Sequence, residues 1–315
     1  MDLFITTFES VAVLIGIGII GFYIIKKQVL PANILNVLSP LALEIALPSL
    51  IFVRIVTNFN FNDYPDWWQL PLWWLFFTAI AFFMTVIFMF LSKKKTRSEF
   101  ALSLFFQNAI FFPLAILAGM FTDEKYIIYL FFFTVLYPPL FFSTYFLFFK
   151  TKKIKINIKK IIHPVLIATI IAVLIVSLGI NISEDNFLAR IFSLLGAMTI
   201  PLLFIILGGN IYKDFKGSGK FELVEIIKFV IIKNFIFPFI FLSILVFIKE
   251  YLTYPIALIL ILQSAVPPVT AVPIVTERVG GNRAIVNQFI VASFATSLVS
   301  IPLIIYFFGI YFPTP

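Results

Sequence analysis

Amide and hydroxyl side chains stand beside prolines at two places inside long apolar runs, and these residues could bind a solute. The richer place spans residues 263–273 and contains Gln263, Ser264, Pro267, Pro268, Thr270 and Pro273. A proline removes a backbone donor and clashes with the carbonyl one turn back, so three of them this close cannot sit in a regular helix. The pattern predicts a broken helix whose unwound part faces a polar cavity. A simple proline kink is the alternative.

The second place is weaker and has Gln107 and Asn108 followed by Pro113. Two adjacent amides in an apolar run are costly unless they are hydrogen-bonded. Contact between neighbouring helices, worth about 1 kcal/mol, is the alternative to a binding role. A half-helix that begins at a break carries partial positive charge, which favours an anion. Together the two places predict a binding site for a small anion.

Two ionisable residues, Glu44 and Lys233, also lie inside apolar runs. A carboxylate within a membrane indicates function by default, and Glu44 is the candidate for proton coupling. The alternative is a neutral or paired Glu44 at an interface, beside Lys233 or Gln107. Lys233 could face an anionic substrate, but we favour an ammonium that extends to the membrane interface. His163, which opens an apolar run beside a basic loop, is interpreted as an interface residue.

Several other kinds of chemistry are excluded by what the sequence lacks. It has no Cys and one His, which rules out a thiolate or multi-histidine metal site. It has neither a Gly-rich phosphate loop ending in Gly-Lys-Ser/Thr nor a Gly-x-Ser-x-Gly nucleophile motif. We therefore predict no enzymatic activity, no cofactor and no bound metal.

The elements that must position these residues are membrane spans. Of 315 residues, 62% are hydrophobic and 12% charged, whereas soluble domains have about one quarter charged residues. A span needs about 20 mostly apolar residues. The segments that qualify are Phe4–Ile25, Ile34–Val56, Trp68–Leu91, Ala101–Phe121, Tyr126–Phe149, Ile161–Ile180, Leu188–Tyr212, Val224–Ile248, Pro255–Val275 and Ala284–Ile310. We predict an all-α integral membrane protein with about ten transmembrane helices.

The loops between these spans alternate in charge. Most Lys and Arg residues lie in the odd-numbered loops, and the even-numbered loops are mainly acidic. By the positive-inside rule the odd loops are cytoplasmic, which predicts a protein of the cell (plasma) membrane with both termini outside. The net charge of +8 has the same explanation, so we predict no nucleic-acid partner.

The most basic loop, residues 151–160, divides the chain into a first repeat, residues 1–150, and a second repeat, residues 161–315. Each half has five spans, an odd number, so halves of one fold would be inverted repeats. Short matches fall in corresponding spans. Gln107-Asn108-Ala109-Ile110 matches Gln263-Ser264-Ala265-Val266, and Leu47-Pro48-Ser49-Leu50 matches Ile200-Pro201-Leu202-Leu203.

Several motifs carry a family resemblance. They are Leu47-Pro48-Ser49-Leu50-Ile51-Phe52, Pro201-Leu202-Leu203-Phe204, Pro267-Pro268-Val269-Thr270-Ala271, Glu277-Arg278-Val279-Gly280-Gly281 and Ser297-Leu298-Val299-Ser300-Ile301-Pro302. With them the chain resembles, over nearly its whole length, the auxin efflux carrier family. That family includes plant PIN-type carriers and prokaryotic malate- or malonate-permease-like members, and the short central loop resembles the prokaryotic ones.

The resemblance implies two inverted five-helix repeats whose fourth and ninth spans are broken and cross near the midplane. Spans one, two, six and seven would form a scaffold, often a homodimer, and spans three to five and eight to ten a transport domain. The crossover positions would be Asn108, Pro113, Pro267 and Pro268. The chain departs from the family at Ala109-Ile110, at Ala115 in place of a second proline, and at Thr270, where members often carry Asn.

We therefore predict a secondary active transporter of small organic anions that works by an elevator-type mechanism. Its partners would be a small carboxylate substrate and the lipid bilayer. The alternative is a non-transporting receptor or sensor that uses the same fold to bind a small molecule.

Overall fold

A computed structural model describes residues 2–121, 123–149, 163–180, 182–216 and 221–314. In these residues the regular structure is helical, apart from one isolated bridge between Gln107 and Pro268. Seven helical segments are long and apolar enough to cross a membrane, and three shorter apolar helices are Phe111–Met120, Pro164–Ser177 and Tyr254–Ala265. The all-helical membrane fold is confirmed, and the count of ten spans stays a prediction. The basic linker, residues 151–160, and Ile161 lie outside the described residues.

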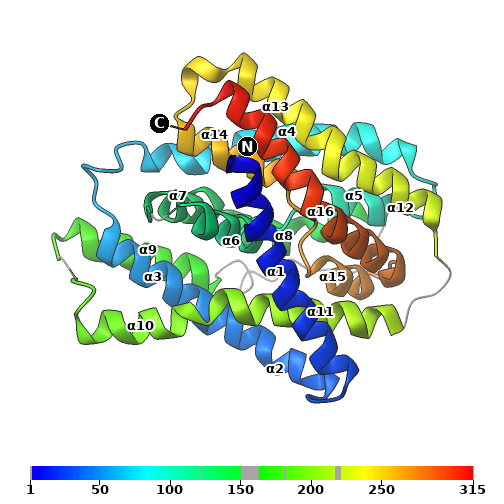
Figure 1. Ribbon diagram of the computed structural model, residues 1–315, viewed down its shortest axis with the longest axis horizontal. Helices are drawn as coiled ribbons and strands as arrows, with labels where there is room; N and C mark the ends of the chain where they lie inside the picture. The colour runs from blue at the N-terminus through cyan, green and yellow to red at the C-terminus, as the bar shows by residue number, and fades with distance from the viewer. Residues whose placement is uncertain (1, 122, 150–162, 181, 217–220, 315) are drawn as a thin grey trace.

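The helices follow the predicted spans in order (Figure 1). The first half contains α1 (Asp2–Lys26), α2 (Leu35–Pro40), α3 (Leu47–Asn58), α4 (Leu70–Phe88), α5 (Arg97–Phe105), α6 (Phe111–Met120), α7 (Lys125–Thr134) and α8 (Tyr137–Thr144). The second half contains α9 (Pro164–Ser177), α10 (Phe187–Ala197), α11 (Thr199–Lys216), α12 (Leu223–Val230), α13 (Phe237–Phe247), α14 (Tyr254–Ala265), α15 (Val272–Arg278) and α16 (Arg283–Tyr311).

Two π-helical turns lie inside predicted spans. Leu41–Ala46 joins α2 to α3, and Ile231–Ile236 joins α12 to α13. Each turn is followed directly by a helix whose second residue is a proline, Pro48 or Pro238. The proline ring would clash with the carbonyl one turn back, and the wider π turn relieves that clash. The bulge in each span is thus a local consequence of its proline.

The helices form two sets. In the first set α3 packs on α9 and α10, and α1 and α2 pack on α11. The second set contains α4–α8 and α12–α16, with α14 and α16 at its centre. Figure 1 shows α3, α9 and α10 at one edge and α4, α12 and α13 along the opposite edge. The two sets meet mainly where α1 contacts α16 and α6.

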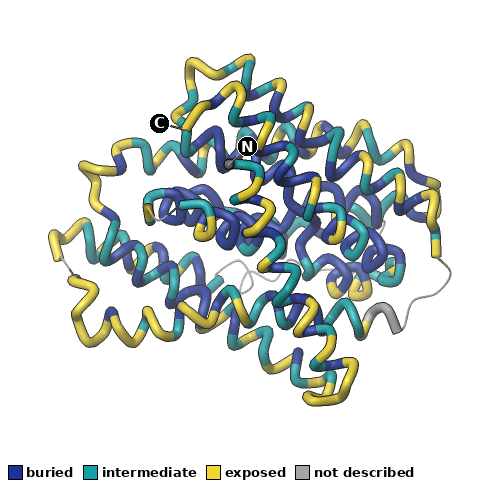
Figure 2. The backbone as a smooth tube through the Cα atoms, in the orientation of Figure 1, coloured by how far each residue is buried: buried dark blue, intermediate teal, exposed yellow. Residues whose placement is uncertain are grey.

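Burial divides the molecule into a packed centre and an apolar periphery. Every residue from Ile256 to Ala265 of α14 is buried, and Figure 2 shows the buried residues gathered over α6, α7 and α14. By contrast, α10 exposes Phe187, Leu188 and Leu194. Large apolar side chains on the outside of a helical protein fit a lipid surface or a second protein.

An ion pair joins the two sets at the acidic-loop end. Arg54 Nη1 lies 2.7 Å from Glu124 Oε1, while Glu124 Oε2 is buried without a partner among the described residues. Burial raises the pKa of Glu124, Arg54 lowers it, and Glu184 and Asp123 raise it further, so the pKa is raised overall. The attraction of Arg54 therefore does not compensate for the burial of the carboxylate.

Replacing this carboxylate by an amide, Glu124→Gln, is expected to raise the melting temperature at about pH 8. A raised folded-state pKa means that the folded protein favours the protonated acid, so stability is lost as pH rises through that pKa. The gain should therefore shrink toward about pH 4, where wild-type Glu124 is protonated. Thermal melts in one detergent at both pH values check this, with Glu250→Gln, at an exposed carboxylate away from this pair, as the control. A lower melting temperature for Glu124→Gln at the higher pH would mean that the Arg54 attraction dominates.

Candidate functional site

Two helices are interrupted in the centre of the second set. The helix is broken between α5 and α6 at residues 106–110 and between α14 and α15 at residues 266–271. Each segment begins in an extended conformation and ends in a turn. The two segments run antiparallel, with a bridge between Gln107 and Pro268. The Asn108 N–H donates to the Pro267 carbonyl at 2.8 Å, and the Val269 N–H donates to the Phe106 carbonyl at 3.0 Å. These bonds satisfy backbone groups that lipid could not satisfy. We call the two segments the crossover.

Side chains from other spans replace the donors that the prolines lack. In a regular helix, the N–H of residue 113 would bind the Ala109 carbonyl, and that of residue 268 the Ser264 carbonyl. Instead, Gln263 Nε2 donates to the Ala109 carbonyl at 2.7 Å. Lys233 Nζ donates to the Ser264 carbonyl at 3.5 Å, which is long for a hydrogen bond. Each break is therefore supported by a residue far from it in the sequence.

The three predicted binding residues Gln107, Gln263 and Ser264 are engaged within the protein. Gln107 Nε2 donates to Gln263 Oε1 at 3.2 Å, and both side chains are buried. The Tyr137 hydroxyl donates to the Gln107 carbonyl at 2.6 Å. The Ser264 hydroxyl donates to the Ile261 carbonyl of its own helix at 2.7 Å. The structure thus gives Gln107 and Gln263 contacts that hold the crossover together.

Lys233 is buried, and the interpretation that its ammonium extends to the membrane interface is wrong. Its side chain is 1% exposed, and Nζ lies 4.9 Å from the centre of the Phe237 ring. The carbonyls at the C-terminal end of α14 carry partial negative charge, which attracts a cation. Lys233 is not among the residues that line the cavity described below.

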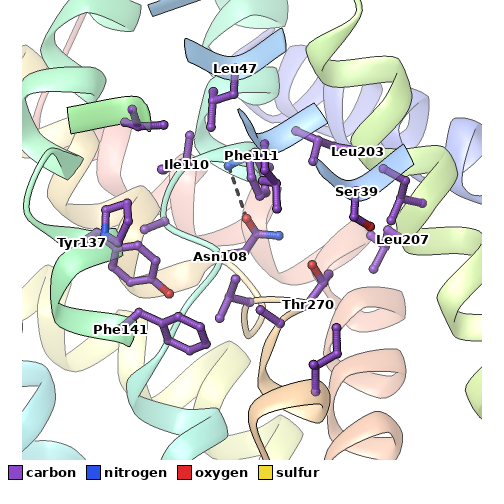
Figure 3. A pocket seen from close by; sticks show the side chains of 18 of the residues that line it. Ser39, Leu47, Asn108, Ile110, Phe111, Tyr137, Phe141, Leu203, Leu207 and Thr270 are labelled. Carbon is purple, nitrogen blue, oxygen red and sulfur yellow. Dashed lines mark hydrogen bonds between the residues drawn. The ribbon is translucent and has the colours of Figure 1, made fainter. Parts of the chain in front are cut away.

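A cavity of about 150 Å³ lies in front of the crossover, between the two sets of helices. A single water needs only about 10–15 Å³ measured in this way, so the cavity has room for a small organic molecule. Figure 3 shows Asn108 and Thr270, one from each crossover segment, beside the same space, with Ser39 and Leu207 from the first set across from them. Its polar lining residues are Ser39, Asn108, Tyr137, His163, Asn210 and Thr270.

The cavity carries donors but no charged lining residue in the described part of the chain. Asn108 Oδ1 accepts a hydrogen bond from the Phe111 N–H at 3.3 Å, at the start of α6 (Figure 3). Because the oxygen is engaged, the two N–H donors of the amide remain for a solute. The Thr270 hydroxyl is a further donor at the cavity wall. The start of α6 adds the partial positive charge of a helix N-terminus.

The remaining predicted residues lie at the crossover or away from it. Pro113 is in the first turn of α6, and Pro267 and Pro268 are in the crossover. Glu44 is exposed on the π-helical turn before α3 and does not line the cavity. Within the described part of the chain it makes no hydrogen bond or ion pair, so it is not paired with Lys233 or Gln107.

Sequence reasoning missed four polar residues that line the cavity, which are Ser39, Tyr137, His163 and Asn210. Each is a single polar residue in or beside an apolar run, with no motif around it. His163 was interpreted as an interface residue and instead borders the cavity. The one signal available was that an isolated polar group in a membrane span usually faces the protein interior.

The fold and this crossover define a multi-pass helical membrane protein with a cavity beside two broken helices. Residues 6–305 match a family described as membrane transport protein, which is the auxin-efflux-like family. The chain belongs to this family and is therefore a membrane transporter. No curated protein matches the chain. The family resemblance found in the sequence is confirmed, and the malate-permease-like subtype stays a prediction.

Proposed function

We propose that this protein is a secondary active transporter of small organic anions and that the cavity beside the crossover is its substrate site. One observation carries the proposal. The Asn108 amide and the Thr270 hydroxyl, which come from the two different broken helices, converge on one cavity large enough for a small solute. Two half-helices that meet at a solute site are a recurring feature of secondary transporters.

The lining favours an anion held by neutral donors. A carboxylate is an acceptor only, and the cavity offers it amide and hydroxyl donors together with the start of α6. No acidic side chain of the described residues lines the cavity to repel it. Without a fixed cation the anion would also leave readily, as a carrier requires. The malate- and malonate-permease-like members of the family suggest small carboxylic acids as the first compounds to test.

The proposed movement is that of an elevator. The second set of helices, which contains both crossover segments, would be the transport domain, and the first set the scaffold. In the ten-span arrangement these sets combine two inverted repeats, residues 1–150 and 161–315. The proposal is supported by the place of the cavity at the boundary between the sets. We further propose that the exposed apolar face of α10 belongs to a scaffold homodimer, and that both termini lie outside the plasma membrane.

The cavity lies nearer the basic-loop ends of the spans, which are cytoplasmic in the proposed orientation. Ser39 is close to the start of the second span, His163 directly precedes α9 near the start of the sixth, and Asn210 is close to the end of the seventh. At the opposite end the Arg54–Glu124 ion pair joins the two sets. We therefore propose that this conformation presents the site to the cytoplasm.

The first test measures binding and transport with the same purified protein. Small mono- and dicarboxylates that bind should raise its melting temperature in detergent by mass action. Asn108→Ala should weaken binding roughly tenfold or more, because a hydrogen bond to a charged group is lost. Asn62→Ala, at an exposed loop position, is the matched control and should bind like the wild type.

Transport is then measured as counterflow of the identified acid in liposomes. Saturable counterflow that Asn108→Ala reduces and Asn62→Ala does not is the expected result. Binding without any counterflow would instead support the receptor. If no carboxylate shifts the melting temperature and none is exchanged, the organic-anion proposal is wrong, while the family assignment stands.

A further inference from the structure

His163 borders the cavity from the first set of helices. It is the N-cap residue of α9, and its Nδ1 accepts a hydrogen bond from the Val165 N–H at 3.3 Å. Its ring is stacked on Phe142 of α8, with centroids 6.1 Å apart and planes inclined by 12°. The cap and the stack together fix both the position and the plane of the imidazole.

The cap also determines which ring nitrogen carries the proton. Because Nδ1 accepts from the Val165 N–H, the neutral imidazole has its hydrogen on Nε2. A second proton on Nδ1 would remove the cap of α9, and the capping contact therefore favours the neutral ring. His163 thus offers one donor of fixed direction, at the end of the ring away from the cap.

Few of the other polar groups at this cavity are equally available. The Ser39 hydroxyl donates to the Leu35 carbonyl at 2.7 Å, and the Tyr137 hydroxyl donates to the Gln107 carbonyl. Asn108 and Thr270 belong to the crossover, in the other set of helices. His163 and Asn210 are consequently the donors that the first set contributes among the described lining residues. A solute held by Asn108 and Thr270 would still have its far end next to the first set.

We propose that His163 is a specificity-determining residue, whose neutral Nε2–H donates to a second acceptor oxygen of the transported acid. The inference rests on the proposed function. It adds a chemical criterion, because an acid with a second carboxylate or a hydroxyl oxygen can use both ends of the cavity. An acid with a plain hydrocarbon tail would displace water from the Nε2–H without offering it an acceptor, which costs affinity.

Two substitutions separate this donor from the capping role. His163→Asn keeps a good N-cap acceptor for the Val165 N–H but is too short to place a donor where Nε2 lies. His163→Gln has a side-chain N–H at about the reach of Nε2 but is a poor N-cap. If His163 only caps α9, His163→Gln should be the more damaging substitution. If its Nε2–H also contacts the substrate, His163→Asn should impair substrate selectivity more.

The measurement compares succinate with butyrate by thermal shift and by counterflow in liposomes. The two acids have carbon chains of equal length, but succinate has a carboxylate at both ends and butyrate at one end. The wild type should prefer the dicarboxylate succinate over the monocarboxylate butyrate. His163→Asn should reduce that preference roughly tenfold or more, with butyrate binding unchanged, and His163→Gln should keep most of it. Such a change in the ratio of affinities is not produced by a loss of stability alone.

The outcomes that overturn the inference are distinct from those that overturn the proposed function. If the wild type binds these acids and His163→Asn keeps the preference, His163 does not contact the substrate, and the transporter proposal is unaffected. If His163→Asn weakens the binding of succinate and of butyrate to the same extent, His163 has a structural role, and this result would also overturn the inference. Binding of neither acid by the wild type would count against both.

Discussion

Gln263→Leu is expected to be among the most damaging single substitutions at the crossover. The change removes the donor to the Ala109 carbonyl and the acceptor for Gln107 Nε2, in a region where Gln263 is fully buried. Each buried polar group left unpaired costs about 1–3 kcal/mol, so the free energy of unfolding should fall by about 2–6 kcal/mol. Counterflow should be lost as well, because the same bonds hold the two broken helices in register.

The neighbouring substitution Ser264→Ala is the matched control. Ser264 is equally buried, but its hydroxyl only donates back to the Ile261 carbonyl of its own helix. Its removal leaves no group of another span unpaired, and the expected change is within about 1 kcal/mol. Thermal and denaturant unfolding of both variants in the same detergent measures the two losses of stability. Equal losses for the two substitutions would show that the contact between the spans is not what stabilises this region.

Gly208→Ala is expected to disrupt the packing of α1 on α11. A Cβ at this position would lie 1.7 Å from the Gly18 carbonyl oxygen and 2.6 Å from its carbon. Both are backbone atoms, so no side-chain rotation can relieve the overlap. Small residues allow membrane helices to approach this closely, and overpacking typically costs about 1–3 kcal/mol, occasionally more. We expect Gly208→Ala to lower the free energy of unfolding by an amount in the upper part of that range, or to prevent folding.

Gly16→Ala provides the comparison for this prediction. Gly16 lies on α1 as well, but a Cβ there would meet nothing within 4 Å. Since alanine is also the better helix former, the variant should melt at or slightly above the wild-type temperature. The experiment is a melting curve together with size-exclusion chromatography in detergent. A Gly208→Ala protein as stable as Gly16→Ala would mean that the two helices are farther apart than described here.

The sequence by itself determined the membrane class and the positions of the breaks. An apolar run of about 20 residues has to cross the bilayer as a helix, because lipid offers its backbone no other partner. Pro267 and Pro268 remove donors from their own helix wherever the rest of the chain lies. The helix boundaries at Ala265 and Val272 follow from these local facts. The motifs at residues 47–52 and between residues 201 and 302 also sufficed to indicate the family.

Tertiary structure alone decided which polar residues line the cavity and which hold the protein together. Gln263 and Ser264 are neighbours with similar surroundings in the sequence, yet only Gln263 meets a partner 154 residues away. Lys233 lies within an apolar run that favours an ammonium at the membrane interface, yet it is buried, with Nζ near a carbonyl 31 residues away that lacks its helical donor. The role of a buried polar side chain depends on the partner that helix packing brings to it, and that partner is not encoded in the local sequence.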